Sequence, residues 1–303
     1  MMRVKEEFVI DEVRDYIDNN ITLVIANASQ EERKNAIHKE FSDKKMMMSI
    51  TYGDDKFILT NSNDIVPISK IASYDNLGRV LTSFPGINIK NILIDITSLQ
   101  HVVLACLLKK VLLEIKPARV FLSYVKPKTY LLGDEKSYNF SLEFTASSAI
   151  PGFASPSKKD EILVPFLGFE GNRLRNIIGD EHYSDINPII GFPSDDPMWQ
   201  FETLKYCKDA IIEQNAQLKM RKCKADSIYD AYYMLERIAF DYTGKPVVIA
   251  PLGTRPHFVA AIIYALKHKR ECRIIYDNAK EKNNYSAGIR NIKIYHISRY
   301  IGE

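Results

Sequence analysis

The stretch VIAPLGTRPH, residues 248–257, begins with an apolar strand-like segment and continues through a turn that holds Gly253, Thr254 and Arg255. An apolar helix-like segment follows this turn, and a second strand-like segment at residues 273–276 completes the pattern. Such an order is typical of a parallel βαβ unit, in which the turn before the helix presents backbone N–H groups to anions. The stretch therefore predicts an α/β fold with an anion-binding turn.

A similar strand, turn, helix and strand pattern occurs at residues 92–130. When the two segments are aligned without gaps, Thr97 and Ser98 fall on Gly253 and Thr254, and each helix carries a histidine at the same position. Few of the aligned residues are identical, but the order of the pattern is the same. We therefore expect two Rossmann-like modules, pseudo-duplicated, each with a mainly parallel sheet and helices on both faces.

The strongest linker signal in the chain is the segment 146–160, which is rich in Ser, Pro, Gly and Ala. We place the domain boundary within it, so that residues 1–150 form an irregular N-terminal Rossmann-like module and residues 151–303 form a more regular C-terminal one. In the first module, residues 61–86 are rich in turn formers and predict an irregular loop or insertion. In the second module, residues 292–297 predict the last strand.

The composition is typical of a folded, soluble protein. Of the 303 residues, 46% are hydrophobic and 26% are charged, and the 41 Lys and Arg residues exceed the 38 Asp and Glu residues by three. This excess is too small to indicate nucleic-acid binding through bulk charge. The four cysteines form no C-x-x-C pair, and the chain begins without a signal-peptide pattern. We expect a cytoplasmic protein with no cofactor, no bound metal and no membrane contact.

The turn at Gly253, Thr254 and Arg255 combines several features that favour an anion. Glycine lets the backbone approach a ligand closely, threonine caps a helix or donates a hydrogen bond, and the planar guanidinium suits phosphate or carboxylate. Pro256 suits a first helical position. The alternative is a well-capped helix whose arginine pairs with an acidic side chain of the same chain.

Three further places are candidates for ligand contacts. Gly168, Glu170 and Arg173 surround a second turn between a strand and a helix, where Glu170 could hold a ribose hydroxyl or only complement the helix dipole. The hydroxyls of Thr97 and Ser98 could bind phosphate or only cap their helix. Tyr276, at the end of a strand, could stack on a base or pack in the core.

Catalytic signatures are missing from the sequence. The dinucleotide fingerprint G-x-G-x-x-G, the P-loop and the nucleophile elbow G-x-S-x-G do not occur. Asp195 and Asp196 are adjacent carboxylates before a proline and a helix, a pattern more typical of a helix cap than of a metal site. We therefore assign no catalytic residue.

The segments IDITS (94–98) and LGTRP (252–256), each between an apolar strand and a helix, resemble the ligand loops of CRISPR-associated Rossmann-fold (CARF) domains and of the related SAVED sensors. Those families bind cyclic or linear oligonucleotide second messengers in prokaryotic antiviral defence, often through two Rossmann-like modules. The first segment lacks the glycine that such loops commonly carry. The resemblance implies a sensor in which the residues near the ligand are Thr97, Ser98, Gly253, Thr254 and Arg255.

Together these observations predict a non-catalytic nucleotide-binding sensor or scaffolding subunit of a prokaryotic antiviral defence or signalling complex. Because no effector domain is recognisable, the expected partners are a nucleotide or oligonucleotide and a protein that carries an effector activity; a homo-oligomer is compatible with the sequence. Two alternatives stay open. One is a nucleotide-processing enzyme for phosphoribosyl or glycosidic transfer that uses Glu170 or the pair Asp195 and Asp196. The other is a purely structural interaction protein.

Overall fold

The computed structural model describes residues 6–61, 68–133, 137–138, 140–156, 159–282 and 284–300. The chain divides into two compact units, of which unit 1 comprises Met1–Leu131 and Ser286–Glu303, and unit 2 comprises Leu132–Tyr285. Unit 2 is therefore a continuous segment that is inserted into the sequence of unit 1.

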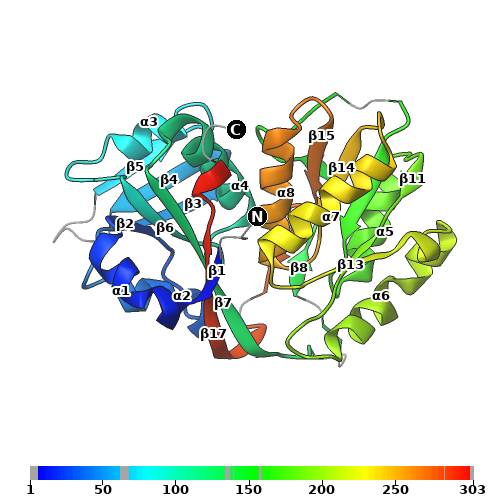
Figure 1. The fold of residues 1–303 in the computed structure, drawn as a ribbon, viewed down its shortest axis with the longest axis horizontal. Coiled ribbons are helices and arrows are strands. Elements are labelled where there is room, and N and C mark those ends of the chain that lie inside the picture. Colours follow the sequence, from blue (N-terminus) through cyan, green and yellow to red (C-terminus); the bar gives the residue numbers. More distant parts are fainter. Residues whose placement is uncertain are drawn as a thin grey trace, which may run out of the picture. The chain divides into compact units, whose positions relative to one another are not determined.

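Within the described residues, unit 1 is built around an eight-stranded mixed sheet (Figure 1). Its four central strands run parallel, and the outer strands on both sides are antiparallel to their neighbours. In spatial order the strands are β1 (Glu7–Val9), β17 (Ser286–His296), β7 (Arg119–Tyr130), β6 (Asn91–Asp95), β2 (Leu23–Ile25), β3 (Met47–Gly53), β4 (Lys56–Asn61) and β5 (Ile68–Ala72).

The helices of unit 1 form because their apolar residues recur at helical spacing. In α1 (Ile10–Asn20), the buried Ile10 and Ile17 lie two turns apart and face the sheet, and α2 (Glu32–Phe41) contributes Ile37 to the same core. The remaining helical segments are α3 (Leu77–Thr82) and α4 (His101–Lys110), and α4 continues as one π-helical turn (Val111–Ile115).

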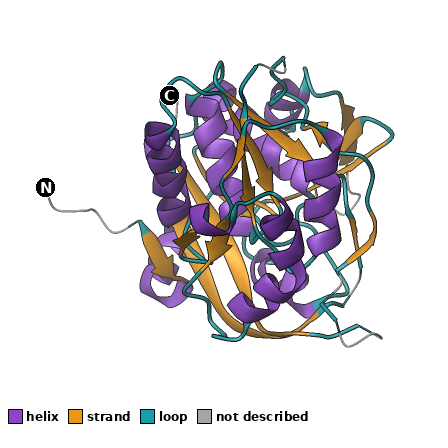
Figure 2. Ribbon diagram, turned by 90° about the vertical axis from the view of Figure 1, so that its right-hand side faces the viewer, coloured by secondary structure: helices purple, strands orange, loops and turns teal. Residues whose placement is uncertain are grey.

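Unit 2 contains a mainly parallel sheet, with helices drawn in purple and strands in orange in Figure 2. The sheet order is β13 (Arg221–Cys223), β12 (Ile189–Gly191), β10 (Ile162–Phe166), β14 (Val247–Pro251), β15 (Cys272–Tyr276) and β9 (Ser148–Ala149), and β11 (Asp185–Ile186) also pairs with β10. Only β9 is antiparallel to its neighbour in this sheet, as far as the described residues go. A separate two-stranded ladder joins β8 (Ser141–Glu143) to β16 (Lys280–Glu281).

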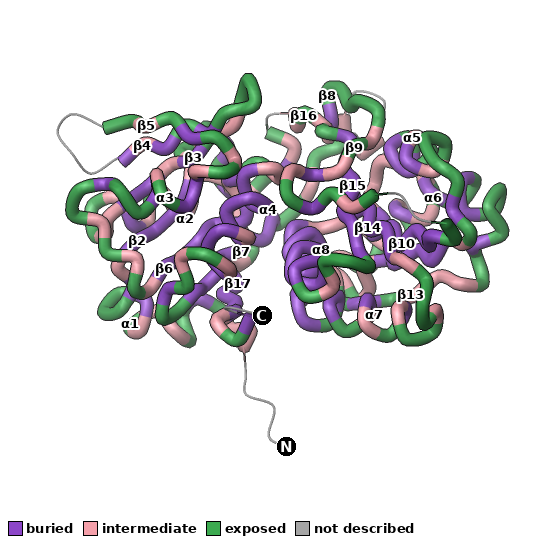
Figure 3. The backbone as a smooth tube through the Cα atoms, turned by 90° about the horizontal axis from the view of Figure 1, so that it is seen from above, coloured by how far each residue is buried: buried purple, intermediate pink, exposed green. Residues whose placement is uncertain are grey.

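The helices of unit 2 cover both faces of its sheet. On one face, α5 (Gly171–Asp180) and α6 (Trp199–Glu213) pack on alternate strand residues such as Leu163 and Val248. On the other face, α8 (Arg255–Lys267) packs against Phe166 and is accompanied by α7 (Ile228–Asp241). The strands β10 and β14 and the helix α8 are almost completely buried (Figure 3).

The strand order of unit 2 creates a topological switch point. The chain adds β12 and then β13 on one side of β10, and then returns to add β14 and β15 on the other side. The connections that leave β10 and β14 therefore diverge to opposite faces. In parallel α/β sheets, ligands bind at the carboxyl ends of the two strands that flank such a point.

These observations confirm the predicted α/β fold class with Rossmann-like parallel strands. Both sequence segments that carry the pattern fold as parallel βαβ units, because β6 is parallel to β7 and β14 is parallel to β15. Whether the two units arose by duplication stays a prediction.

The structure divides the chain elsewhere than at the predicted boundary between residues 150 and 151. Residues of the predicted linker form β9, which pairs with β15 inside unit 2. The predicted last strand, 292–297, lies in β17 except for residue 297, and it pairs with β7 and β1 of unit 1. Ser, Pro and Gly mark turns in a sequence, but they do not show which core the flanking strands join.

The segment 61–86 is more regular than the sequence predicted. Outside residues 62–67, which the structure does not describe, it contains β5 and α3. The strand β5 pairs along β4, where Leu59 lies opposite Lys70 and Ile58 lies opposite Ile71. This pairing supplies backbone hydrogen bonds that the turn-rich composition does not reveal.

We predict that residues 132–285, expressed alone, fold cooperatively. This fragment retains β8, β9 and the whole parallel sheet of unit 2, whereas the fragment 151–303 lacks β8 and β9 and carries β17 without its partners. Thermal unfolding, monitored by near-ultraviolet circular dichroism, would compare the cooperativity of the two fragments. A sharp transition for 151–303 and none for 132–285 would contradict the division.

Candidate functional site

The switch point of unit 2 is lined by backbone rather than by side chains. A Cβ atom on Gly168, just after β10, would lie 2.1 Å from the carbonyl oxygen of Leu252, just after β14. A Cβ atom on Gly253 would lie 2.9 Å from His257 Nδ1 and 3.1 Å from the Leu167 carbonyl oxygen. The contact at Gly168 is too short for any side chain, so glycine is required there for the two loops to touch, whereas a Cβ atom on Gly253 would force His257 to shift. The predicted residues Gly168 and Gly253 are thus neighbours.

Thr254 caps the helix that follows Gly253. Its hydroxyl oxygen accepts the backbone N–H of His257 at 3.5 Å, and the hydroxyl donates to the carbonyl oxygen of Ala225 at 2.5 Å. The second bond ties the start of α8 to the loop that follows β13. Thr254 therefore caps the helix, which is one of the two roles predicted for it from the sequence.

Arg255 forms an ion pair within unit 2. Its Nη2 atom lies 2.7 Å from Oε1 of Glu281, and the two side chains are 10% and 24% exposed. The other carboxylate oxygen of Glu281 accepts a hydrogen bond from the hydroxyl of Tyr285 at 3.3 Å. This is the arrangement that the sequence analysis gave as the alternative to a ligand contact. Because Glu281 is partly exposed, the pair lies at the margin of the buried region.

Arg173 forms a tighter and more deeply buried ion pair. Its Nε and Nη2 atoms donate to the two oxygens of Asp277 at 2.7 and 2.6 Å, and Asp277 is fully buried. Its Nη1 atom donates to Glu170 at 3.1 Å. Burial acts to lower the pKa of Arg173, but the hydrogen bonds to Asp277 and the nearby negative charges outweigh it and raise the pKa above its ordinary value.

Glu170 is surrounded by donors of its own chain. Its Oε1 atom accepts the backbone N–H groups of Phe140 and Ser141 at 3.1 and 2.8 Å, and its Oε2 atom accepts the Ser141 hydroxyl at 3.0 Å and the Arg173 guanidinium. The carboxylate therefore fastens the strand β8 to the start of α5. Its bonds leave little capacity for the ribose contact that the sequence suggested.

Tyr276 is a core residue at the end of β15. Its side chain is 3% exposed, its ring packs edge-on against Phe258, and the Arg173 guanidinium lies 5.4 Å from the ring centre. Burial raises the pKa of Tyr276 to about 12, so the phenol is neutral near pH 7. The buried position of Tyr276 favours a packing role in the core over stacking on a ligand base.

His257 lies behind the Gly253 turn and is completely buried. Its ring stacks on Phe166 with the ring centres 4.9 Å apart, and its Nε2 atom lies 3.1 Å from the Lys224 carbonyl oxygen, which places the proton on Nε2. The Nδ1 atom then presents a lone pair and has no hydrogen-bond partner among the described residues. Burial lowers the pKa of His257 to about 4.

Thr97 and Ser98 lie in unit 1, and their polar groups are engaged within it. The Asp95 carboxylate accepts the backbone N–H groups of Thr97 and Ser98, each at 3.1 Å. The Thr97 hydroxyl oxygen accepts the N–H of Val125 at 2.9 Å, and the Ser98 hydroxyl oxygen accepts that of Asn27 at 3.0 Å. The carboxylate thus occupies the place where the sequence suggested a phosphate.

The structure therefore brings together seven of the nine predicted ligand residues at the carboxyl edge of the unit 2 sheet. They are Gly168, Glu170, Arg173, Gly253, Thr254, Arg255 and Tyr276. The acidic partners Asp277 and Glu281 were not among the predicted site residues. Asp277 directly follows β15, so the rule that polar residues at strand ends form sites could have found it.

The adjacent carboxylates at Asp195 and Asp196 do not form a metal site with other residues. Asp196 accepts the backbone N–H of Met198 at 2.9 Å, which forms a local turn just before α6 and does not cap the helix. Over the whole described part of the chain, no group of three or more His, Cys, Asp or Glu side chains is arranged to hold a metal ion.

Comparisons with known proteins give no relative for this chain: no family model, curated protein or solved structure matches it. The resemblance to CARF and SAVED domains therefore stays a prediction. Among the described residues, no helix is long and apolar enough to cross a membrane.

We predict that acidification destabilises the protein through His257. Its pKa is about 4 in the folded state against an ordinary value of 6.5, so the unfolded chain binds the extra proton between these two values. The loss of stability due to His257 is absent above pH 6.5 and grows to about 3 kcal/mol near pH 4. Denaturant unfolding of wild type and of His257→Gln at several pH values would measure it. If the two proteins show the same pH dependence between 4 and 7, the assignment fails.

We also predict that Gly168→Ala lowers the free energy of unfolding by more than about 2 kcal/mol, because the new methyl group overlaps the Leu252 carbonyl. The matched control is Gly179→Ala in α5, where an added Cβ meets nothing within 4 Å. The control should be neutral or stabilising by up to about 1 kcal/mol. Equal stabilities of the two variants would show that the two loops are not in contact.

Proposed function

We propose that unit 2 binds an anionic nucleotide ligand at the carboxyl ends of β10 and β14, and that the chain is a non-catalytic sensor or scaffolding subunit of a prokaryotic antiviral defence or signalling complex. The observation that carries the proposal is the strand order, which puts the Gly168 and Gly253 loops together at the topological switch point. The N-terminus of α8 and Arg255 lie at the same place.

Of the two arginines at this edge, Arg255 is the one suited to exchange its partner for a ligand. Arg173 makes a two-bonded pair with a fully buried aspartate, and removing either group would leave an uncompensated buried charge. Arg255 makes a pair with the partly exposed Glu281. A phosphate group offers more charge and more acceptor oxygens than a carboxylate, so it could replace Glu281 beside the guanidinium.

His257 supports a ligand at the Gly253 loop. Buried polar atoms are nearly always hydrogen-bonded, and its Nδ1 atom is an exception among the described residues. The atom lies directly behind the backbone of Gly253. A small movement of this loop on binding would let a donor group of the ligand reach the Nδ1 atom of His257. This histidine therefore has a hydrogen-bond acceptor next to the loop that no described residue uses.

The bonding of the candidate catalytic groups favours a binding role over the enzyme alternative. Glu170 is engaged by four donors, and His257 is neutral and enclosed. Burial raises the pKa of Cys223 well above its usual range, so its thiol is a poor nucleophile near pH 7. Nucleotide turnover by the purified protein would nevertheless reject the sensor proposal in favour of the enzyme.

We predict opposite effects of two substitutions on ligand affinity. Arg255→Ala should weaken the binding of the anionic ligand about tenfold to more than a hundredfold, because a charge-assisted hydrogen bond is lost. Glu281→Gln should strengthen it, because the competing carboxylate is removed from Arg255. Calorimetric titration with mononucleotides, NAD and short linear and cyclic oligonucleotides would measure both effects.

The matched control is Arg175→Ala, because Arg175 is an exposed arginine of α5 that lies 3.6 Å from Asp209, outside this edge of the sheet. The ligand affinity of the Arg175→Ala variant should equal that of wild type. Arg255→Ala should also unfold at a lower temperature, since the ion pair with Glu281 is lost. If Arg255→Ala is destabilised but binds every ligand as wild type does, Arg255 is a structural residue and the proposed site is wrong. If no ligand binds wild type, the purely structural alternative is favoured.

A further inference from the structure

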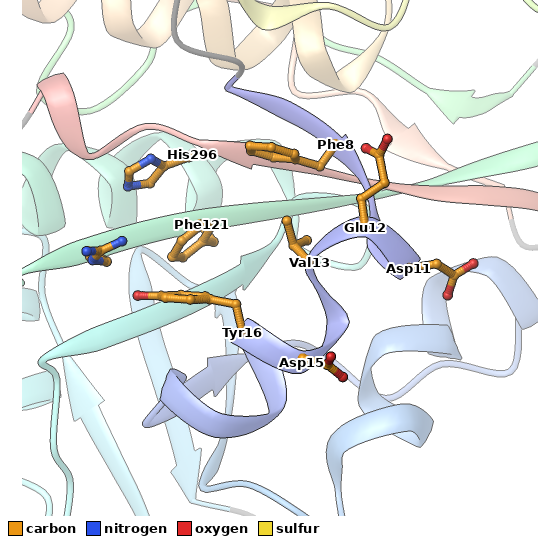
Figure 4. A pocket seen from close by; sticks show the side chains of 9 residues that line it. Phe8, Asp11, Glu12, Val13, Asp15, Tyr16, Phe121 and His296 are labelled. Atoms are coloured by element: carbon orange, nitrogen blue, oxygen red, sulfur yellow. The ribbon is translucent and has the colours of Figure 1, made fainter.

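Unit 1 contains a pocket of about 400 Å³ that the proposed function does not use (Figure 4). Its lining comes from β1, α1, β7 and β17, which are far apart in the sequence but adjacent in the fold. The volume lies in the range of pockets that hold small organic ligands, about 300–1,000 Å³.

The floor of the pocket is a series of aromatic rings. Phe121 of β7 lies directly opposite His296 of β17 in the antiparallel ladder, and their rings stack with centres 4.7 Å apart and planes 19° apart. Tyr16 of α1 continues the series, with its ring centre 5.5 Å from that of Phe121. The Tyr16 plane is tilted by 49° from that of Phe121, and a ring at the end of such a series favours a planar ligand that stacks on it.

The two ends of the pocket have opposite polarity. The Arg119 guanidinium lies 5.3 Å from the centre of the Tyr16 ring, and Arg119 shares a face of β7 with Phe121 because it is two residues away. Asp11 and Asp15, one helical turn apart on α1, line the side away from His296 (Figure 4). One end therefore offers hydrogen-bond donors, and the other offers acceptors from Asp15 and from Asp11, although Oδ1 of Asp11 already accepts from Arg14 at 3.3 Å.

His296 contributes a neutral ring to this floor. Burial and then the charge of Arg119 lower the pKa of His296 below its ordinary value, and its Nε2 atom lies 2.7 Å from the Ser298 hydroxyl. With Glu12 included, the lining carries three carboxylates and one guanidinium, so its net charge is negative. A phosphate group is therefore disfavoured here.

We propose that this pocket binds a purine or pyrimidine nucleoside, or the free base, without a phosphate. The planar ring would stack on Tyr16 at the end of the aromatic series, its carbonyl or ring-nitrogen acceptors would face Arg119, and its amino donors would face Asp15. The site is distinct from the strand-end site of unit 2 in both its residues and its preferred charge.

The test is calorimetric titration of the full chain with guanosine, adenosine and cytidine. Tyr16→Ala should weaken binding at least about fivefold, since base stacking on an aromatic side chain is worth roughly 1–3 kcal/mol. Asp15→Asn, an exposed change that should not disturb folding, should weaken the binding of all three nucleosides, because each carries an amino group. The control is Asp18→Asn on the same helix, which lies outside the pocket and should bind as wild type does.

Nucleoside binding that is unchanged in both Tyr16→Ala and Asp15→Asn would overturn the proposal, and so would the absence of nucleoside binding to wild type. Tighter binding of a 5′-monophosphate that Tyr16→Ala does not weaken would place the ligand elsewhere. Tighter binding of an organic cation such as arginine amide would show the pocket to be a cation site instead. Arg255→Ala should leave nucleoside affinity unchanged, which separates this test from that of the strand-end site.

Discussion

The ion pair between Arg173 and Asp277 is the interaction on which the strand-end edge of unit 2 depends. Both groups are withdrawn from water, and Asp277 is fully buried, so each is tolerated only because the other is present. The pair joins the first turn of α5 to the end of β15, and Glu170 extends it to the backbone of β8. Three segments far apart in the sequence are thereby held at one edge of the sheet.

This constraint also decides which charges are available to a ligand. Arg173 is committed to the fold, because it satisfies two carboxylates that have little contact with water. Arg255 pairs with a partly exposed carboxylate, that of Glu281, and follows a glycine turn at a helix N-terminus. We therefore propose that this edge binds an anion through backbone donors and the Arg255 guanidinium, rather than through an open basic surface.

The sequence contained enough local information to predict the βαβ units and the strand-end position of most candidate residues. Apolar strands, capped helices and glycine turns are local patterns, and Gly168 and Gly253 came together because both follow neighbouring parallel strands. The partners across the chain could not be predicted in the same way. No local pattern encodes the contacts by which β17 joins unit 1. The same holds for the contacts by which the Asp95 carboxylate fills the turn at Thr97.

The most direct measurement of the central claim is the response of the backbone amides to a mononucleotide in the full, isotope-labelled chain. We predict that the largest amide shifts occur at Gly253, Thr254, Arg255 and His257 and at Gly168, with smaller effects beside Glu281. Shifts confined to residues of unit 1, or no shifts at millimolar nucleotide, would contradict a ligand site at the switch point of unit 2.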